Sequence, residues 1–164
     1  MCKDDLERRG LVMDTQSNSD GLIVRVIEPG DAAAVSVLIG QLGYERSAQQ
    51  VLEWIAGAGS GIEQAAFVAC LHGQVVGWIE VSIVRHLQAA PHALVGGLVV
   101  KEGLRGRGVG RHLCRRAEEW SWSRSLTTVR VMSRSTRPDA HRFYLRDGYG
   151  IVKTSLVLEK HRSC

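Results

Sequence analysis

A short run of glycines and arginines over residues 98–113 holds the side chains whose types and spacing best suit chemistry. Its pattern, Arg105-x-x-Gly108-x-Gly110, lies between an apolar run and an amphipathic segment. Glycines permit a tight turn whose amides approach a ligand closely. A helix that begins there adds unpaired N–H donors and a partial positive charge. The stretch therefore predicts a site for a phosphate or pyrophosphate, formed by Arg105, Gly106, Arg107, Gly108, Val109, Gly110 and Arg111.

This spacing differs from two familiar phosphate-binding patterns. It is not the Gly-x-Gly-x-x-Gly of dinucleotide-binding proteins, and no Gly-Lys-Ser/Thr follows, as a P-loop requires. A glycine–arginine turn can also be an ordinary solvated connection. The strand expected before the turn and the helix expected after it favour the binding interpretation.

These residues resemble the acetyl-CoA motif of the GNAT superfamily of N-acetyltransferases. The later segment with Tyr144, Gly148 and Tyr149 is similar to the family's later helix, which carries a tyrosine and ends in a Gly-Tyr turn. The resemblance covers residues 67–160, with a weaker match over 22–55. It implies an α/β fold in which helices flank a mixed central β-sheet with a bulged, splayed central strand. It also implies an acetyl-CoA-dependent N-acetyltransferase, with acetyl-CoA as cosubstrate.

The resemblance assigns roles to single residues. Tyr144 would be the general acid that protonates the leaving thiolate. A backbone N–H near Leu98 would stabilise the developing oxyanion, and Val100 would pair with the pantetheine arm. Where the family often has an asparagine, this chain has Ser133 and Arg134, either of which would contact the cofactor. The expected cofactor contacts on the central strand and after the next strand are therefore Leu98, Val99, Val100 and Ser133.

The general base is expected on a neighbouring strand. Several enzymes of the family use a carboxylate in or beside the central strand, and residues 93–100 contain none. Glu80 lies in an apolar run of the preceding strand, where an unpaired carboxylate would be costly. Three roles stay open for Glu80: acceptance of the proton, attraction of the cationic amine, or a purely structural role.

The first pair of helices would lie over the acceptor site by the same resemblance. Tyr44, Glu45 and Trp54 are candidate contacts, although Trp54 is better explained by core packing. The expected reaction transfers acetyl to a primary amine of a small molecule or protein by direct attack in a ternary complex, because no cysteine sits where a covalent carrier is needed. The alternatives are a non-catalytic CoA-binding regulatory module and a basic nucleic-acid-binding protein.

Composition bounds the class of protein. The chain has 164 residues, 45% hydrophobic and 23% charged, with a net charge of +4. We expect a flexible arm over residues 1–20 and a single domain over 21–164.

No nucleic-acid motif accompanies the basic charge. No apolar run reaches the ~20 residues of a membrane span. Four scattered cysteines fit a reducing, cytoplasmic compartment. No metal-site spacing is present, and dimers are common in the family resembled.

Turn signals and hydrophobic periodicity place the elements. Asp31 and Ser47 are expected helix N-caps, and His72-Gly73 a hairpin turn. Gly96-Gly97 interrupts the central strand and predicts a bulge. Strands are expected at 22–26, 66–71, 75–84, 93–100, 127–133 and 151–160, a polar loop at 85–91, and the later helices at 109–123 and 138–147.

Overall fold

The computed structural model describes residues 16–17, 21–57 and 62–162 of the chain. They fall into two compact units, Met1–Val131 and Met132–Cys164, which are considered separately. The arm expected over residues 1–20 lies outside the described residues, except for β1 (Gln16–Ser17), which pairs with β2. None of the helices described is both long enough and apolar enough to cross a membrane.

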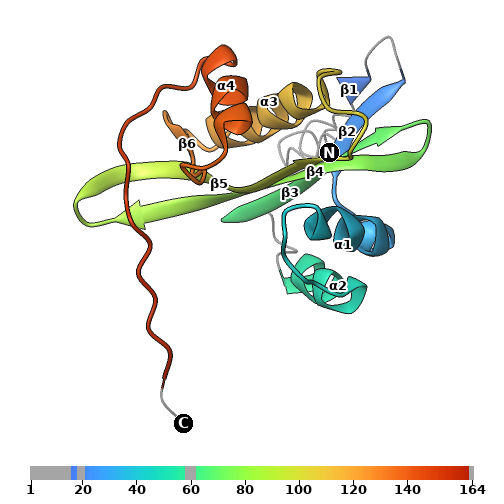
Figure 1. Cartoon of the computed structure of the whole chain (residues 1–164), viewed down its shortest axis with the longest axis horizontal. Coiled ribbons are helices and arrows are strands. Elements are labelled where there is room, and N and C mark those ends of the chain that lie inside the picture. The colour runs from blue at the N-terminus through green and yellow to red at the C-terminus, as the bar shows by residue number, and fades with distance from the viewer. Residues whose placement is uncertain (1–15, 18–20, 58–61, 163–164) are drawn as a thin grey trace, which may run out of the picture. The chain divides into compact units, whose positions relative to one another are not determined.

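The first unit contains one mixed sheet in the order β1-β2-β3-β4-β5-β6 (Figure 1). All neighbours pair antiparallel except β5 and β6, which are parallel and joined by a helical crossover. This arrangement confirms the mixed α/β sheet. The remaining strands are β2 (Leu22–Val26), β3 (Gln64–Leu71), β4 (Gln74–His86), β5 (Ala89–Val100) and β6 (Val129–Val131).

Helices cover both faces of this sheet (Figure 1). One face packs against α1 (Ala32–Gly40) and α2 (Ala48–Gly57), and the other against α3 (Val109–Trp122). The α1–α2 side is held by a buried cluster of Ala32, Val35, Leu38, Val51, Val68, Cys70, Trp78 and Val99. The α3 side buries Val109, Leu113, Cys114, Ala117 and Trp120 at helical spacing.

Ser47 caps α2 as expected. The Gln50 amide N–H donates to the Ser47 hydroxyl at 3.1 Å, and the Ser47 N–H donates to the Gln50 side-chain oxygen at 2.9 Å. This reciprocal pair is a capping box, which satisfies two donors at the helix start. The cap therefore fixes the point at which the chain enters α2.

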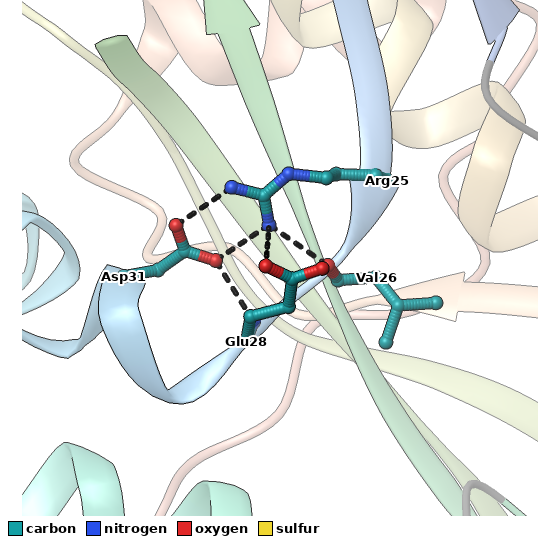
Figure 2. Close-up of polar contacts among 4 residues, drawn as sticks. All are labelled: Arg25, Val26, Glu28 and Asp31. Atoms are coloured by element: carbon teal, nitrogen blue, oxygen red, sulfur yellow. Dashed lines mark hydrogen bonds and ion pairs between the residues drawn. The ribbon is translucent and has the colours of Figure 1, made fainter. Parts of the chain in front are cut away.

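Asp31 was expected to cap α1 with its side chain, and this expectation is wrong. A short 3-10 turn, η2 (Pro29–Asp31), leads directly into α1, so Asp31 already has helical backbone angles and makes no side-chain cap. Its carboxylate instead accepts two hydrogen bonds from the Arg25 guanidinium, at 2.7 and 2.8 Å, and one from the Glu28 N–H (Figure 2). The interaction joins β2 to the start of α1.

The loop expected over residues 85–91 is largely strand. β4 continues to His86 and β5 begins at Ala89, with Val84 opposite His92. His92 is buried, and its imidazole lies 3.3 Å from the Ala90 carbonyl. Backbone pairing stabilises these residues without an apolar pattern, so hydrophobic periodicity did not reveal them.

The second unit contains α4 (Pro138–Arg146). Pro138 occupies the first helical turn, as expected. Gly148, with φ of +94°, turns the chain after the helix, and the Tyr149 N–H donates to the Tyr144 carbonyl at 3.0 Å. The strand expected over 151–160 is not formed: residues 149–162 have no helix or strand and pair with no described strand.

Candidate functional site

The turn between β5 and α3 needs glycine for its backbone conformation. Gly103, Gly106 and Gly108 have φ of +81°, +80° and +83°, a region that other residues enter only with strain. A Cβ atom at any of the three would meet nothing within 4 Å. The space beside this turn is therefore open, and backbone shape rather than crowding requires the glycines.

The turn leads into the exposed N-terminus of α3. Gly108 is the N-cap residue and makes no side-chain cap, and the first helical hydrogen bond runs from the His112 N–H to the Gly108 carbonyl at 3.1 Å. The amides of Val109 and Gly110 precede that bond, and the first turn carries no acidic residue. Exposed arginines on and beside the turn add positive charge: Arg105, Arg107 and Arg111. These features fit a phosphate or pyrophosphate.

β5 is bulged at the predicted glycines. Glu80 of β4 pairs with Gly97, and Val81 pairs with Val95, so Gly96 is the additional residue. On the other side of β5, β6 pairs only with residues 93–95. Among the described residues, Gly96 to Val100 therefore has a strand neighbour on the β4 side alone, which agrees with a bulged strand that separates from the next one.

The backbone of Leu98 and Val100 faces this open edge. The Lys101 N–H donates to the Val76 carbonyl of β4 at 2.7 Å. Because backbone groups along an antiparallel strand alternate between its two edges, Val99 also faces β4, whereas Leu98 and Val100 face away from it. The Val99 side chain is buried in the cluster beside α1, so Val99 has neither its backbone nor its side chain on the open edge.

Trp78 packs directly beneath the bulge. A Cβ atom at Gly97 would lie 2.5 Å from Cη2 of the Trp78 ring, so only glycine allows this approach. The ring is buried, and its indole Nε1 has no hydrogen-bond partner among the described residues. A buried N–H without a partner is unusual and costly in a folded protein.

Glu80 lies on the same sheet face, two residues along β4 from Trp78. A Cβ atom at Gly96 would overlap the Glu80 carboxylate, so this carboxylate lies directly against the bulge. Burial raises the pKa of the Glu80 carboxyl above its ordinary value, and the positive charge of Arg46 partly opposes this rise. A carboxyl group whose pKa is raised, beside an irregular strand, is a candidate for proton transfer to or from a bound substrate.

A shallow depression of about 570 Å³ lies at the connection between α1 and α2. It contains two of the three candidate acceptor contacts, Tyr44 and Glu45, but not Trp54, which is half-buried on α2. The Ser36 hydroxyl donates to the Arg46 carbonyl at 2.6 Å and thereby ties this connection to α1. The lining residues are Ser36, Gly40, Tyr44, Glu45, Arg46, Ser47 and Gln50.

Ser133 and Tyr144 belong to the second unit, whereas the other predicted site residues belong to the first. Ser133 is exposed on the connection to α4. The Tyr144 ring is half-buried and makes edge contacts with the rings of Phe143 and Tyr149, at centroid distances of 5.0 and 5.4 Å. These contacts fix the tyrosine within its own helix and turn.

Sequence reasoning missed Trp78 and Arg46. Trp78 and Glu80 are two residues apart on β4 and therefore share a face of the strand, but only the structure shows the indole without a partner beside Gly97. Arg46 directly follows two candidate acceptor residues. Its electrostatic interaction with Glu80 depends on how the α1–α2 connection lies over the sheet, which no local pattern shows.

Comparison with known families gives a match over most of the first unit and into the second. Residues 38–149 match the model of the acetyltransferase (GNAT) family. This range includes Glu80, the bulged strand, the glycine turn and Tyr144.

Individual proteins are also similar. An aminoalkylphosphonate N-acetyltransferase of Salmonella typhimurium is 36% identical over 83 residues, which are 50% of this chain and 54% of that enzyme, so the match spans about half of its length. An aminoglycoside N(6')-acetyltransferase of Stenotrophomonas maltophilia is 29% identical over 77% of this chain and 84% of that enzyme. The solved structure of a proposed acetyltransferase from Agrobacterium tumefaciens matches with a TM-score of 0.73 and 27% identity, over 84% of this chain and 99% of that one.

Proposed function

This chain belongs to the GNAT acetyltransferase family, whose members use acetyl-CoA, and we propose that it transfers the acetyl group to a primary amine of a small molecule. The observation that carries the proposal is the continuous path from the open edge of β5, through the glycine turn, to the N-terminus of α3. It offers backbone groups for the pantetheine arm at Leu98 and Val100. It then offers amides and arginines for the pyrophosphate.

The proposed chemistry uses three groups of the chain. Glu80 accepts a proton from the ammonium group, directly or through water, and so supplies the neutral amine that attacks the thioester carbonyl. The backbone N–H of Leu98 stabilises the negative charge that develops on the carbonyl oxygen. Tyr144 donates its phenolic proton to the departing sulfur. The amine attacks directly in a ternary complex, without a covalent enzyme intermediate.

Two lines of support favour a small acceptor. Two of the relatives named above are N-acetyltransferases of aminoalkylphosphonates and of aminoglycosides, both of which are small amines. The depression at the α1–α2 connection combines the acidic Glu45 with Arg46 and the hydroxyl of Ser36. Such a mixed polar lining suits an amine that also carries other polar groups.

The cofactor part of the proposal is tested by replacing Gly108 with valine. The substitution strains the turn at a φ of +83° and places a branched side chain where the pyrophosphate would lie. We expect the affinity for CoA, measured by isothermal titration calorimetry, to fall roughly tenfold or more, which is about 1.4 kcal/mol.

Gly73→Val is the matched control. Gly73 has a similar φ of +78° and equally open surroundings, but it lies in the β3–β4 hairpin turn. The Gly73→Val variant should have the same backbone strain as Gly108→Val but keep the wild-type affinity for CoA. Equal affinities in the two variants would show that the turn at Gly108 does not hold the cofactor.

A further inference from the structure

The sheet face that carries Glu80 continues beyond the part that α1 and α2 cover. The buried members that β4 and β5 contribute to the cluster beneath these helices are Trp78 and Val99 alone. Figure 1 shows that the β4–β5 hairpin extends past both helices. Two residues beyond Glu80 on the same face of β4, Ser82 pairs with Leu94 of β5, and both are only half-buried. The face beyond Glu80 is therefore partly open.

Arg130 of β6 lies on this same face. Its register partner is Leu94, which pairs in turn with Ser82. Residues that pair directly across strands point to the same face of a sheet. Because Ser82 is two residues from Glu80 and β6 is two strand spacings from β4, the Cα atoms of Glu80 and Arg130 are about 12 Å apart. Both side chains extend over the same face, one negatively and one positively charged when ionised.

A buried histidine orients the Arg130 guanidinium. His92 is 5% exposed and pairs with Val84, which is on the same face of β4 as Glu80. Its Nδ1 lies 3.3 Å from the Ala90 carbonyl oxygen, and its Nε2 lies 3.4 Å from Nη1 of Arg130. A carbonyl only accepts and a guanidinium only donates, so Nδ1 carries the proton and Nε2 accepts from Arg130. The imidazole thus holds one guanidinium nitrogen and leaves the other donors available.

The charge of Arg130 has no counter-ion in the part of the chain that the structure describes. The ion pairs formed there by arginine involve other residues, and Arg130 itself is exposed. A guanidinium is a planar fork that matches carboxylate and phosphate groups bidentately. An exposed guanidinium that is already oriented by a buried side chain therefore suits an anionic group of a ligand.

We propose that Arg130 determines the specificity of the acceptor site by binding an anionic group of the amine whose ammonium group lies at Glu80. The substrate class is then a primary amine that carries a carboxylate, phosphate or phosphonate several bonds from its nitrogen. The inference rests on the proposed function, because it takes Glu80 as the position of the ammonium group. Opposite charges at the two positions orient such an amine, and Arg130 repels a molecule with a second cation in place of the anion.

Binding to the full chain with CoA present tests the proposal, because no acetyl group can then be transferred. The probes are ω-aminopentanoate and ω-aminopropylphosphonate, each compared with a neutral counterpart, the amide and the dimethyl ester. Isothermal titration calorimetry should show that each anion binds roughly fivefold or more tightly than its counterpart. The preference should decrease as the salt concentration rises, because Arg130 is exposed.

Arg130→Gln should abolish the preference for the anionic probes. Arg115→Gln is the matched control, because it removes the same charge from an exposed position on α3, and it should keep the preference. If Arg130→Gln does not fold, Arg130→Lys retains the charge without the planar fork and should lose at least half of the preference. A preference for one probe alone would identify the anion as a carboxylate or as a phosphonate-like group.

Three results would overturn the proposal: equal affinity for charged and neutral probes, no binding of any probe, or a preference that survives in full when Arg130 is replaced. The outcome is separable from that of the proposed function. An Arg130-dependent preference without thiol release from acetyl-CoA would support the anion subsite and contradict the transferase. Thiol release without any preference for anionic amines would contradict the subsite alone.

Discussion

Glu80 is the residue at which stability and activity are expected to conflict. Its carboxylate lies against the bulge at Gly96, and burial raises its pKa because the charged form loses hydration. Replacement by glutamine keeps the shape and removes the charge. If Glu80 accepts the amine proton, Glu80→Gln should lower kcat/KM by roughly 10²- to 10⁴-fold, measured as amine-dependent thiol release. Its thermal midpoint at neutral pH should be unchanged or higher.

The pH dependence has a definite sign for this carboxyl. A carboxyl whose pKa is raised by folding stabilises the folded state at low pH, and that contribution is lost as the pH rises through the raised pKa. Glu80→Gln should therefore gain stability relative to wild type as the pH rises. Glu53→Gln, which replaces an exposed carboxylate, is the control. It should change neither kcat/KM nor the pH dependence of stability. A less stable Glu80→Gln with wild-type turnover would show that Glu80 is structural.

Asp31 is expected to have the opposite pH behaviour. Burial tends to raise the pKa of Asp31, but hydrogen bonds from Arg25 and from the Glu28 N–H together lower it by more than burial raises it. The pKa of Asp31 therefore lies below its ordinary value. The ionised form is then favoured by folding, and its contribution to stability is lost as the pH falls below about 4. Asp31→Asn should remove that part of the acid sensitivity, measured by urea unfolding at several pH values.

Removal of Arg25 alone should destabilise the protein more than Asp31→Asn does. Arg25→Met leaves the carboxylate of Asp31, whose side chain is 7% exposed, without its guanidinium. We expect a loss of about 3 kcal/mol in the free energy of unfolding, at the lower end of the range for a broken buried pair, because Arg25 is partly exposed. The double variant with Asp31→Asn should recover part of the loss. An Arg25→Met protein as stable as wild type would exclude a stabilising role.

At the scale of elements, the two glycines of the β5 bulge have different requirements. A methyl group at Gly97 would collide with the rigid Trp78 ring, whereas one at Gly96 would meet the end of the flexible Glu80 side chain. We expect Gly97→Ala to destabilise the fold by about 1–3 kcal/mol through overpacking. Gly96→Ala should cost less stability, but it should lower turnover by displacing the carboxylate.

Thermal unfolding and steady-state kinetics on the two alanine variants separate these effects. Equal losses of stability, with turnover retained in Gly96→Ala, would contradict the placement of Glu80 against the bulge. Trp78→Phe in the Gly97→Ala background provides a further check, because the smaller ring should relieve part of the overpacking.

Local signals accounted for most elements because the same residues determine both sequence pattern and backbone shape. The glycines at 96 and 97 predicted the bulge, and Ser47 predicted the start of α2; both are confirmed. The His72-Gly73 turn has φ of +49° and +78°, as a tight hairpin requires. Asp31 resembled a cap by sequence, but its carboxylate pairs with Arg25, which is six residues away, and only the folded β2–α1 connection brings them together.

At the scale of the whole molecule, the predicted family and mixed α/β fold are confirmed by the family match and by the sheet. The site could be predicted only in part. The turn residues are adjacent in sequence, so their pattern is visible. The positions of Trp78 and Arg46 relative to Glu80 depend on packing between strands and helices. The period-two pattern over residues 151–160 predicted a strand that the structure does not form, because a strand also needs a paired neighbour, which no local pattern specifies.

Acetyl transfer itself is the most direct test of the account. Purified protein would be incubated with acetyl-CoA and, one at a time, aminoalkylphosphonates, aminoglycosides and polyamines, while release of the free CoA thiol is followed. We predict thiol release that requires both the protein and a small primary amine, together with an acetylated amine of the expected mass. Tight binding of CoA without thiol release for any amine would contradict the proposed transferase and indicate a CoA-binding module instead.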